Sequence, residues 1–318
     1  MTNKISVLGL NAAGFNTSCA LLIDGQPVFA VEEERLVREK RCRRFPAKGI
    51  NLALEKAGID LLDLDAIAVG WNPSVNLESF GGAHSGQARF LGEIFYNVPG
   101  GLMNLTSENA ADCSEQIIHF ENGKKLHIYY VRHHLAHASA FYISPFDEAA
   151  ILTIDAFGEK DCIQFAVGEG CKLKNLWRQE FPHSLGSFYS AFTSYIGFTP
   201  QSDEWKLMGA SAYGNHGRYY QQVRSLVEFN EKGFELELTC FNHFQFHRPG
   251  LFTTKMTEVI GLPPLKKGAH LSQDYYDLSA AVQRVFEEIY FHLLERLYAV
   301  TECKNIVLAG GATLNSLA

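Results

Sequence analysis

The chain is organised around two neighbouring stretches, HHLAH at residues 133–137 and AAILTID at residues 149–155. The first opens an alanine-rich run that favours helix. The second is apolar up to its last residue, which predicts a buried strand that ends in a carboxylate, Asp155. A side chain at the carboxyl end of such a strand points into a cleft. Asp155 is therefore expected where a ligand would bind.

His133 and His137 are four residues apart, which places them on one face of the predicted helix with about 5–6 Å between their Cβ atoms. Two imidazoles at this spacing suit one divalent metal ion, as in other sites built from histidines at i and i+4. Asp155 is the expected third ligand. The competing interpretation is a helix N-terminus whose histidines make ordinary hydrogen bonds.

The composition is that of an ordinary globular protein. Of its 318 residues, 47% are hydrophobic and 20% charged, enough for two lobes with a core each. The net charge of −7 argues against binding nucleic acid through a basic surface. The seven cysteines include no Cys-x-x-Cys pair, and no apolar run reaches the roughly 18–20 residues that span a bilayer. With no signal peptide predicted either, we expect a cytoplasmic protein.

The N-terminal residues predict a strand, a polar glycine-containing turn and two further strands. The predicted strands are residues 4–10, 18–23 and 28–31, and Asp24-Gly25 is a strong hairpin signal between the last two. The turn before the second strand is placed to offer backbone N–H groups to a phosphate, as in many nucleotide-binding lobes. A plain β-meander gives the same pattern.

The next part of the chain predicts a helix at residues 46–58 and strands at 66–69 and 126–131. Residues 72–123 show no clear periodicity. We expect an insertion there that shapes the substrate end of the cleft.

The opening pattern of the chain recurs in its second half. The strand that ends at Asp155 is followed by a glycine-bearing turn at residues 156–159 and a second strand at 162–167. Two openings of one type predict two related lobes, residues 1–143 and 144–318, facing across a cleft. That is the organisation of the actin, hexokinase and Hsp70-type fold, although periodicity alone leaves it as one of several α/β arrangements.

The chain ends on an apolar strand, residues 305–309, followed by Gly310-Gly311 and the start of a helix. Such a turn accommodates phosphate, because glycine lets the backbone approach closely and a helix N-terminus favours an anion. A parallel sheet needs further strands, so we expect a second lobe that is incomplete at residue 318. Before this unit, residues 274–300 predict an amphipathic helix. Its apolar stripe is Ala281, Val285, Ile289, Leu293 and Leu297.

Lys206 stands between carboxylates in the stretch DEWKLMG, residues 203–209. It is a candidate contact for a substrate phosphate. A helix-surface ion pair worth well under about 1 kcal/mol explains it equally. Three later histidines, His243, His247 and His270, fit no compact metal site and are expected to be structural or on the surface.

Seven blocks in the chain resemble the O-carbamoyltransferase family, which includes the nodulation carbamoyltransferase and antibiotic-tailoring enzymes of the tobramycin, cephamycin and ansamycin type. The blocks are residues 7–40, 44–46, 133–137, 155–159, 182–190, 202–214 and 308–315. They follow the family order, which is more specific than any one motif. The resemblance implies a Kae1-like N-terminal domain of the ASKHA class. It also implies a YrdC-like C-terminal domain, which we expect to be absent from these residues.

The resemblance implies a transferase that uses carbamoyl phosphate and ATP to make carbamoyladenylate and passes the carbamoyl group to a hydroxyl of a small-molecule acceptor. A carbamate is a poor electrophile until it carries a good leaving group, and metal and backbone donors stabilise the charge that develops. By the same resemblance a metal ion, expected to be Fe²⁺, is held by His133, His137, Asp155 and an aspartate beyond residue 318. The residues implied against the nucleotide are Gly310, Gly311, Asn315 and, on weaker grounds, Lys206.

Two positions depart from the family pattern. Phe15-Asn16 stands where the family usually has His-Asp, whose histidine is implicated in the transfer step, and Ala156 replaces the first glycine of Asp-Gly-x-Gly-Glu. No catalytic side chain is therefore assigned.

The expected partners are carbamoyl phosphate, a hydroxylated acceptor and the missing YrdC-like domain or a partner chain, with a homodimer among the expected assemblies. The alternative is a degenerate or truncated non-catalytic module that binds nucleotide or metal and needs a partner chain, which Phe15 favours. A third option is a tRNA-modifying threonylcarbamoyl transferase. The negative net charge and the block PHSLG at residues 182–186 argue against it.

Overall fold

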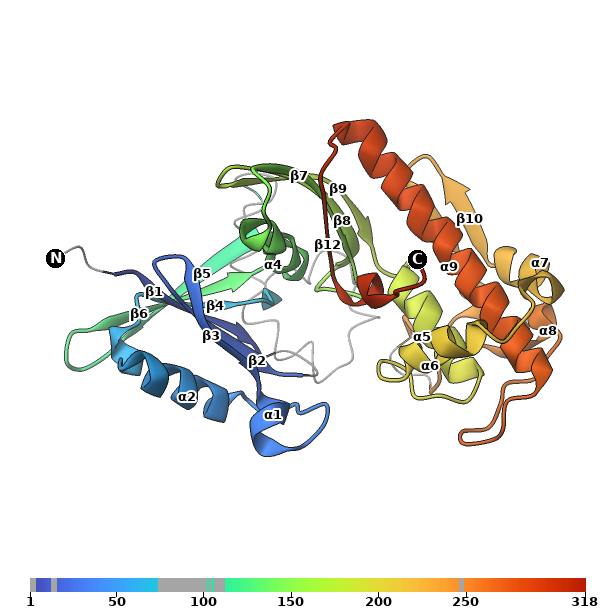
Figure 1. The fold of residues 1–318 in the computed structure, drawn as a ribbon, viewed down its shortest axis with the longest axis horizontal. Helices are drawn as coiled ribbons and strands as arrows, with labels where there is room; N and C mark the ends of the chain where they lie inside the picture. Colours follow the sequence, from blue (N-terminus) through green and yellow to red (C-terminus); the bar gives the residue numbers. More distant parts are fainter. Residues whose placement is uncertain (1–3, 13–15, 74–101, 103–104, 106–111, 246–248) are drawn as a thin grey trace. The chain divides into compact units, whose positions relative to one another are not determined.

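The structure is a computed structural model of the chain, and it describes residues 4–12, 16–73, 102, 105, 112–245 and 249–318. Much of the predicted insertion at 72–123 lies outside the described residues, as does Phe15. The described chain forms two compact units of mixed α and β structure (Figure 1), which meet in sequence between Ala136 and His137.

Unit 1 is built on a six-stranded sheet with the order β3-β2-β1-β4-β6-β5. The neighbours β1 and β2, β2 and β3, and β5 and β6 are antiparallel, whereas β4 runs parallel to both β1 and β6. The strands are β1 (Ser6–Asn11), β2 (Ser18–Ile23), β3 (Gln26–Glu32), β4 (Ala66–Val69), β5 (Cys113–His119) and β6 (Lys125–Val131). The sequence predicted all of these except β5.

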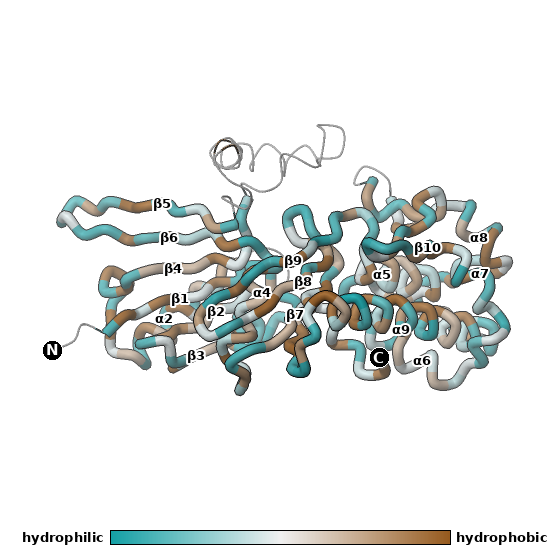
Figure 2. Tube along the Cα trace, turned by 90° about the horizontal axis from the view of Figure 1, so that it is seen from above, coloured by the Kyte–Doolittle hydropathy of each residue, from teal (hydrophilic) through white to brown (hydrophobic). Residues whose placement is uncertain are grey.

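The local signals of unit 1 form the elements they predict. Asp24 and Gly25 both have positive φ, 51° and 75°, as a two-residue hairpin turn requires. Helices α1 (Glu33–Val37) and α2 (Ala47–Ala57) follow, and α2 ends at Gly58 in the left-handed conformation. The tip of the hairpin between β5 and β6 is hydrophilic (Figure 2), as its sequence ENGK at residues 121–124 predicts.

Unit 2 contains a four-stranded sheet with the order β12-β7-β8-β9. Strand β7 is antiparallel to β8 and parallel to β12, and β8 is antiparallel to β9. These strands are β7 (Glu148–Ile154), β8 (Asp161–Glu169), β9 (Lys172–Glu180) and β12 (Ile306–Ala309). Read from its other edge, this sheet has the order β9-β8-β7-β12, and its strand directions match those of β3-β2-β1-β4 in unit 1. The prediction that the opening pattern recurs is therefore confirmed.

The helices of unit 2 pack around its longest helix, α9, which contacts α5, α6 and α7 (Figure 1). All five residues of the predicted apolar stripe of α9 are at most 1% exposed. The helices are α5 (Leu185–Tyr195), α6 (Glu204–Ser211), α7 (Tyr220–Arg224), α8 (Thr254–Ile260) and α9 (Gln273–Thr301), and a small hairpin is formed by β10 (Val227–Asn230) and β11 (Gly233–Leu236). Among the described helices, none is long and apolar enough to cross a membrane.

Candidate functional site

The predicted histidine helix is α4 (His133–Ala138), which continues directly into a 3₁₀ turn, Ser139–Ile143. Arg132, the residue before α4, is 7% exposed. Its guanidinium donates to Asp112 Oδ1 at 2.8 Å, and its backbone N–H donates to Asp112 O at 2.8 Å. The start of the helix is therefore tied to the segment that leads into β5, and α4 presents His133 and His137 one turn apart.

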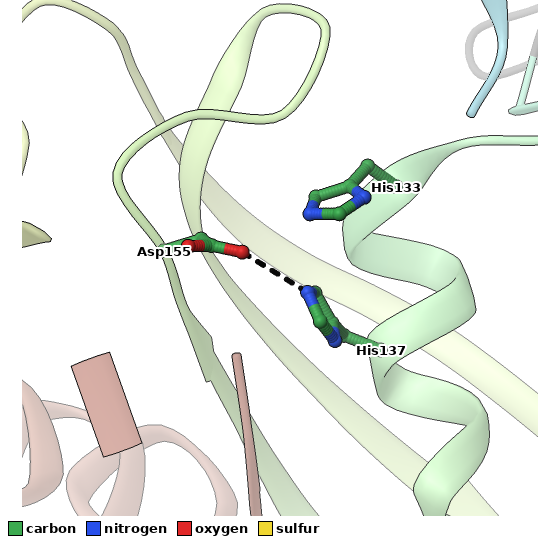
Figure 3. Close-up of side chains that lie close together, drawn as sticks. All are labelled: His133, His137 and Asp155. Carbon is green, nitrogen blue, oxygen red and sulfur yellow. Dashed lines mark hydrogen bonds and ion pairs between the residues drawn. The ribbon is translucent and has the colours of Figure 1, made fainter. Parts of the chain in front are cut away.

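His133, His137 and Asp155 come together as the sequence predicts. One ligand atom from each residue lies within 4.8 Å of the others. His137 Nε2 is 3.1 Å from Asp155 Oδ2, and Figure 3 shows both imidazoles turned towards the carboxylate. The side chains of His137 and Asp155 are 30% and 24% exposed. The three groups thus form a half-buried cluster.

The His133 ring is oriented by unit 1. Its Nδ1 is 3.2 Å from the carbonyl oxygen of Gly70, and its ring lies 5.5 Å from that of Trp71. Because a carbonyl oxygen only accepts hydrogen bonds, Nδ1 carries the proton in this contact. Nε2 is then the basic nitrogen. Histidines that bind metals are commonly oriented in this way, with the second ring nitrogen donating to a backbone carbonyl or a carboxylate.

Asp155 is held at the end of β7 by its own backbone and by the next residue. Its N–H donates to Cys162 O at 2.9 Å, which continues the pairing of β7 with β8. Its Oδ1 accepts from Ala156 N at 2.8 Å, and its Oδ2 faces His137. One carboxylate oxygen is thereby used locally, while the other is presented to the histidines.

The donor set fits a divalent transition metal. Two imidazoles and one carboxylate with open positions are the ligands of many Fe²⁺ and Zn²⁺ centres. Ligand bonds of about 2.1 Å place two donors at most about 4.2 Å apart. The observed spread of up to 4.8 Å therefore asks for side-chain shifts of less than about an ångström.

The glycine turn after β12 packs against the end of β7. Gly310 has φ +97°, and a Cβ added to it would lie 2.2 Å from Ile154 O. A Cβ on Gly311 would lie 3.0 Å from Asp155 Oδ1. Both glycines therefore lie in close contact with the end of β7, beside Asp155. Their expected contact with a phosphate stays a prediction. The residues after them form a short 3₁₀ turn, Gly311–Leu314, in place of the α-helix that the sequence suggested.

Asn315 and Lys206 lie in unit 2 with protein partners. The Asn315 amide exchanges two hydrogen bonds, of 2.9 and 3.0 Å, with Gln283 of α9. Gln283 also accepts from the Tyr189 hydroxyl at 2.9 Å. Lys206 Nζ is 3.0 Å from Asp203 Oδ1 and lies 5.4 Å from the centre of the Trp205 ring. For Lys206, the structure thus contains the ion pair that was the competing interpretation.

Sequence reasoning gave no role to Ser184, which lies beside the cluster. Its side chain caps the N-terminus of α5 by accepting from Ser187 N at 3.1 Å, and it also reaches the carbonyl oxygens of Asp155 and Ala156. A serine just before an apolar helical run is a sequence signal for the cap. No local signal predicts that the same hydroxyl reaches a segment of chain that precedes it by two strands.

Comparison with known proteins gives a family. The family described as "Carbamoyltransferase N-terminus" matches residues 6–318. Among curated proteins, the chain is 34% identical to "Uncharacterized protein sll1178" of Synechocystis over 98% of this chain and 51% of that protein. It is 32% identical to "Nodulation protein NolNO" of Sinorhizobium fredii over 94% of this chain and 40% of that protein. The chain thus spans about half the length of the curated relatives it matches.

Among solved structures, YeaZ from Pseudomonas aeruginosa aligns with 56% of this chain and 68% of its own at 16% identity. The TM-score of that alignment is 0.28, which is too low to bear on the fold.

Proposed function

Because the chain belongs to the carbamoyltransferase family, matching its N-terminal part, we propose that it supplies most of the transfer domain of an O-carbamoyltransferase. The enzyme would move a carbamoyl group from carbamoyl phosphate, by way of an ATP-derived carbamoyladenylate, to a hydroxyl of a small-molecule acceptor. The observation that carries this proposal is the meeting of His133, His137 and Asp155 with the Gly310-Gly311 turn at the end of β7.

The three ligands would hold a divalent metal ion, and we propose Fe²⁺. When bound, the metal would supply positive charge that stabilises negative charge on a carbonyl or phosphoryl oxygen. The chain's own residues orient the site. The Gly70 carbonyl fixes the His133 ring, and the Ala156 N–H fixes one oxygen of Asp155 so that the other faces the metal position.

The glycine turn is the proposed place of the nucleotide phosphates. Side chains are absent at Gly310 and Gly311, so backbone can approach an anion there, and Asn315 follows at the end of the same turn. Lys206 stays in the proposed set as a cation that would have to give up or share Asp203 in order to reach a phosphate.

The proposed architecture is the two-lobed ASKHA, Kae1-like fold. The repeated order β3-β2-β1-β4 and β9-β8-β7-β12, with the same directions, supports it. The same proposal includes lobe limits at residues 143 and 144, a YrdC-like domain as part of the complete enzyme, and a cytoplasmic location.

The first test is metal content. We expect the purified chain to bind a divalent metal weakly, which elemental analysis without prior chelation detects, and the double variant His133→Ala plus His137→Ala to lose it. His216→Ala plus His270→Ala is the matched control, since both of those imidazoles are exposed and belong to no cluster among the described residues. Equal metal content in the two double variants would contradict the metal assignment.

The second test is transfer. Radiolabelled carbamoyl phosphate, ATP and a panel of hydroxylated acceptors are incubated with the chain, alone and with a YrdC-like domain added in trans. We expect no turnover with the chain alone and ATP-dependent carbamoylation when the second domain is added. Metal and ATP binding with no transfer under either condition would favour the non-catalytic module.

A further inference from the structure

We propose that Ser184 is a positioning residue for the metal cluster: it holds the backbone that follows Asp155 and so fixes the direction of the Asp155 carboxylate. This inference rests on the proposed metal site. It concerns a residue of α5's N-terminal cap, which is not itself among the expected ligands.

The Ser184 hydroxyl is fully buried and is shared between a helix and the Asp155 segment. Its oxygen accepts from Ser187 N at 3.1 Å, which caps α5. Its single proton is directed at Ala156 O, 2.5 Å away, with Asp155 O at 3.2 Å. The Ser187 hydroxyl also donates to Ala156 O at 3.2 Å. Both carbonyls that flank Ala156 are therefore within reach of hydroxyls at the start of α5.

Ser184 also reaches the peptide that holds the carboxylate, through its longer contact with Asp155 O at 3.2 Å. The Asp155 carbonyl and the Ala156 N–H belong to one planar peptide group. That N–H donates to Asp155 Oδ1 at 2.8 Å, which leaves Oδ2 3.1 Å from His137 Nε2. A rotation of this peptide would move the donor away from Oδ1, so holding the peptide in place also holds the carboxylate in its direction.

Close packing at Gly186 is independent support for the contact. A Cβ added to Gly186 would lie 2.6 Å from Ala156 N and 2.9 Å from the carbonyl carbon of Asp155. Since real Cβ atoms do not approach other atoms so closely, the first turn of α5 fits against this peptide only with glycine at that position. The arrangement of Ser184 and Gly186 is thus shaped around the backbone of residues 155–156.

The chain just before Ser184 is itself anchored. The Pro182 carbonyl accepts from Ser184 N at 2.9 Å and from His243 Nε2 at 2.9 Å. The His243 ring is enclosed by aromatic neighbours, with its centre 5.4 Å from that of Phe181 and 5.6 Å from that of Phe241. Ser184 therefore joins Asp155 to a packed part of the core.

The experiment compares Ser184→Ala with Thr193→Val. Both changes remove a buried hydroxyl from the region of α5, but the Thr193 hydroxyl donates to Tyr189 O within the helix and does not reach Asp155. We expect Ser184→Ala to weaken Co²⁺ binding by about 10–100-fold in a chelator competition, as loss of an outer partner of a metal ligand typically does. Thr193→Val should bind as the wild type does. Gly186→Ala should weaken binding in the same direction as Ser184→Ala, while leaving the hydroxyl in place.

A second measurement, made on the metal-free protein, accompanies the measurement of Co²⁺ affinity. In the metal-free protein, we expect amide hydrogen exchange at residues 155–158 to be faster in Ser184→Ala than in wild type or in Thr193→Val. Unchanged affinity and unchanged exchange in Ser184→Ala would overturn the proposal. If the wild-type chain binds no Co²⁺, the metal assignment is wrong, and the exchange rates alone decide whether Ser184 holds the Asp155 segment.

Discussion

Strands β1 and β7 occupy the same place in the two sheets, yet they are buried differently. In β1, buried residues alternate with half-buried ones up to Leu10, and Leu8 and Leu10 belong to one hydrophobic core. In β7, every residue after Glu148 is buried. Its alternate residues belong to two different cores, with Leu152 in one and Ile151 in the other. A strand covered on both faces has little freedom to move.

The difference bears on the site, because Asp155 directly follows β7. A carboxylate that must point in one direction is held more firmly when it follows a strand packed on both faces, because the side chains around such a strand interlock with few voids. The turn after β1 follows a strand with one fully covered face. The same topology therefore supplies a strand covered on both faces in unit 2 and a strand with one fully covered face in unit 1.

The largest expected effect tests this difference directly. Ile151→Ala should lower the free energy of unfolding by about 2–5 kcal/mol, since it leaves a cavity on the second face of β7. The position facing away from the main core in β1 is Val7, which is half-buried. Val7→Ala should cost about 1 kcal/mol or less. Hydrogen exchange at increasing denaturant concentration, followed separately in unit 1 and unit 2, measures both losses of stability. Equal losses of stability in the two variants would show that β1 and β7 do not differ in packing.

The next effect concerns pH and the support behind Asp155. Burial lowers the pKa of His243 from 6.5 to about 4, opposed by its hydrogen bond to Pro182 O. Between these values the unfolded chain binds more protons than the folded one, so stability falls as pH drops from 6.5 towards 4. The total loss is about 3 kcal/mol, at about 1.4 kcal/mol per pKa unit.

His243→Gln isolates this contribution, because glutamine can donate to Pro182 O but does not titrate near neutral pH. Unfolding measured at intervals between pH 7 and pH 4 should show a shallower loss of stability in the variant. Parallel pH profiles for the two proteins would show that His243 titrates alike in the folded and unfolded states.

The smallest expected losses of stability come from alanine substitutions at two glycines with positive φ. Gly310→Ala meets both a positive φ and Ile154 O at 2.2 Å, so we expect a loss of about 2–3 kcal/mol. Gly25 also has a positive φ, but no described atom lies within 4 Å of its added Cβ. Gly25→Ala should therefore cost only about 1 kcal/mol. Thermal unfolding of both variants measures the difference. A Gly310→Ala protein as stable as Gly25→Ala would show that the turn after β12 is not packed against β7.

Much of the fold was predictable because burial follows local periodicity. The α9 stripe repeats at helical spacing and is buried along its length, and the Asp24-Gly25 turn forms the hairpin that its residue types favour. Strand β5 was not predicted because most of its residues are exposed, so CSEQIIH at 113–119 carries no alternation of apolar and polar positions. Its pairing with β6 is what defines it.

In the candidate site, too, some residues were predictable from the sequence and others were not. His133 and His137 were predictable from their spacing, and Asp155 from its place after an apolar strand. The roles of Ser184 and of Gln283, which pairs with Asn315, depend on segments that meet only in the folded chain. Residue types alone do not encode such contacts. Phe15, one of the departures from the family pattern, lies outside the described residues.

A Co²⁺ titration of wild type and Asp155→Asn asks directly whether Asp155 and the two histidines bind one metal ion. Asparagine keeps an oxygen to accept from Ala156 N but removes the negative charge. We expect visible d–d absorption that saturates at one Co²⁺ per wild-type chain, with much weaker binding in Asp155→Asn and in His133→Ala plus His137→Ala. Equal titrations for wild type and both variants would contradict this expectation.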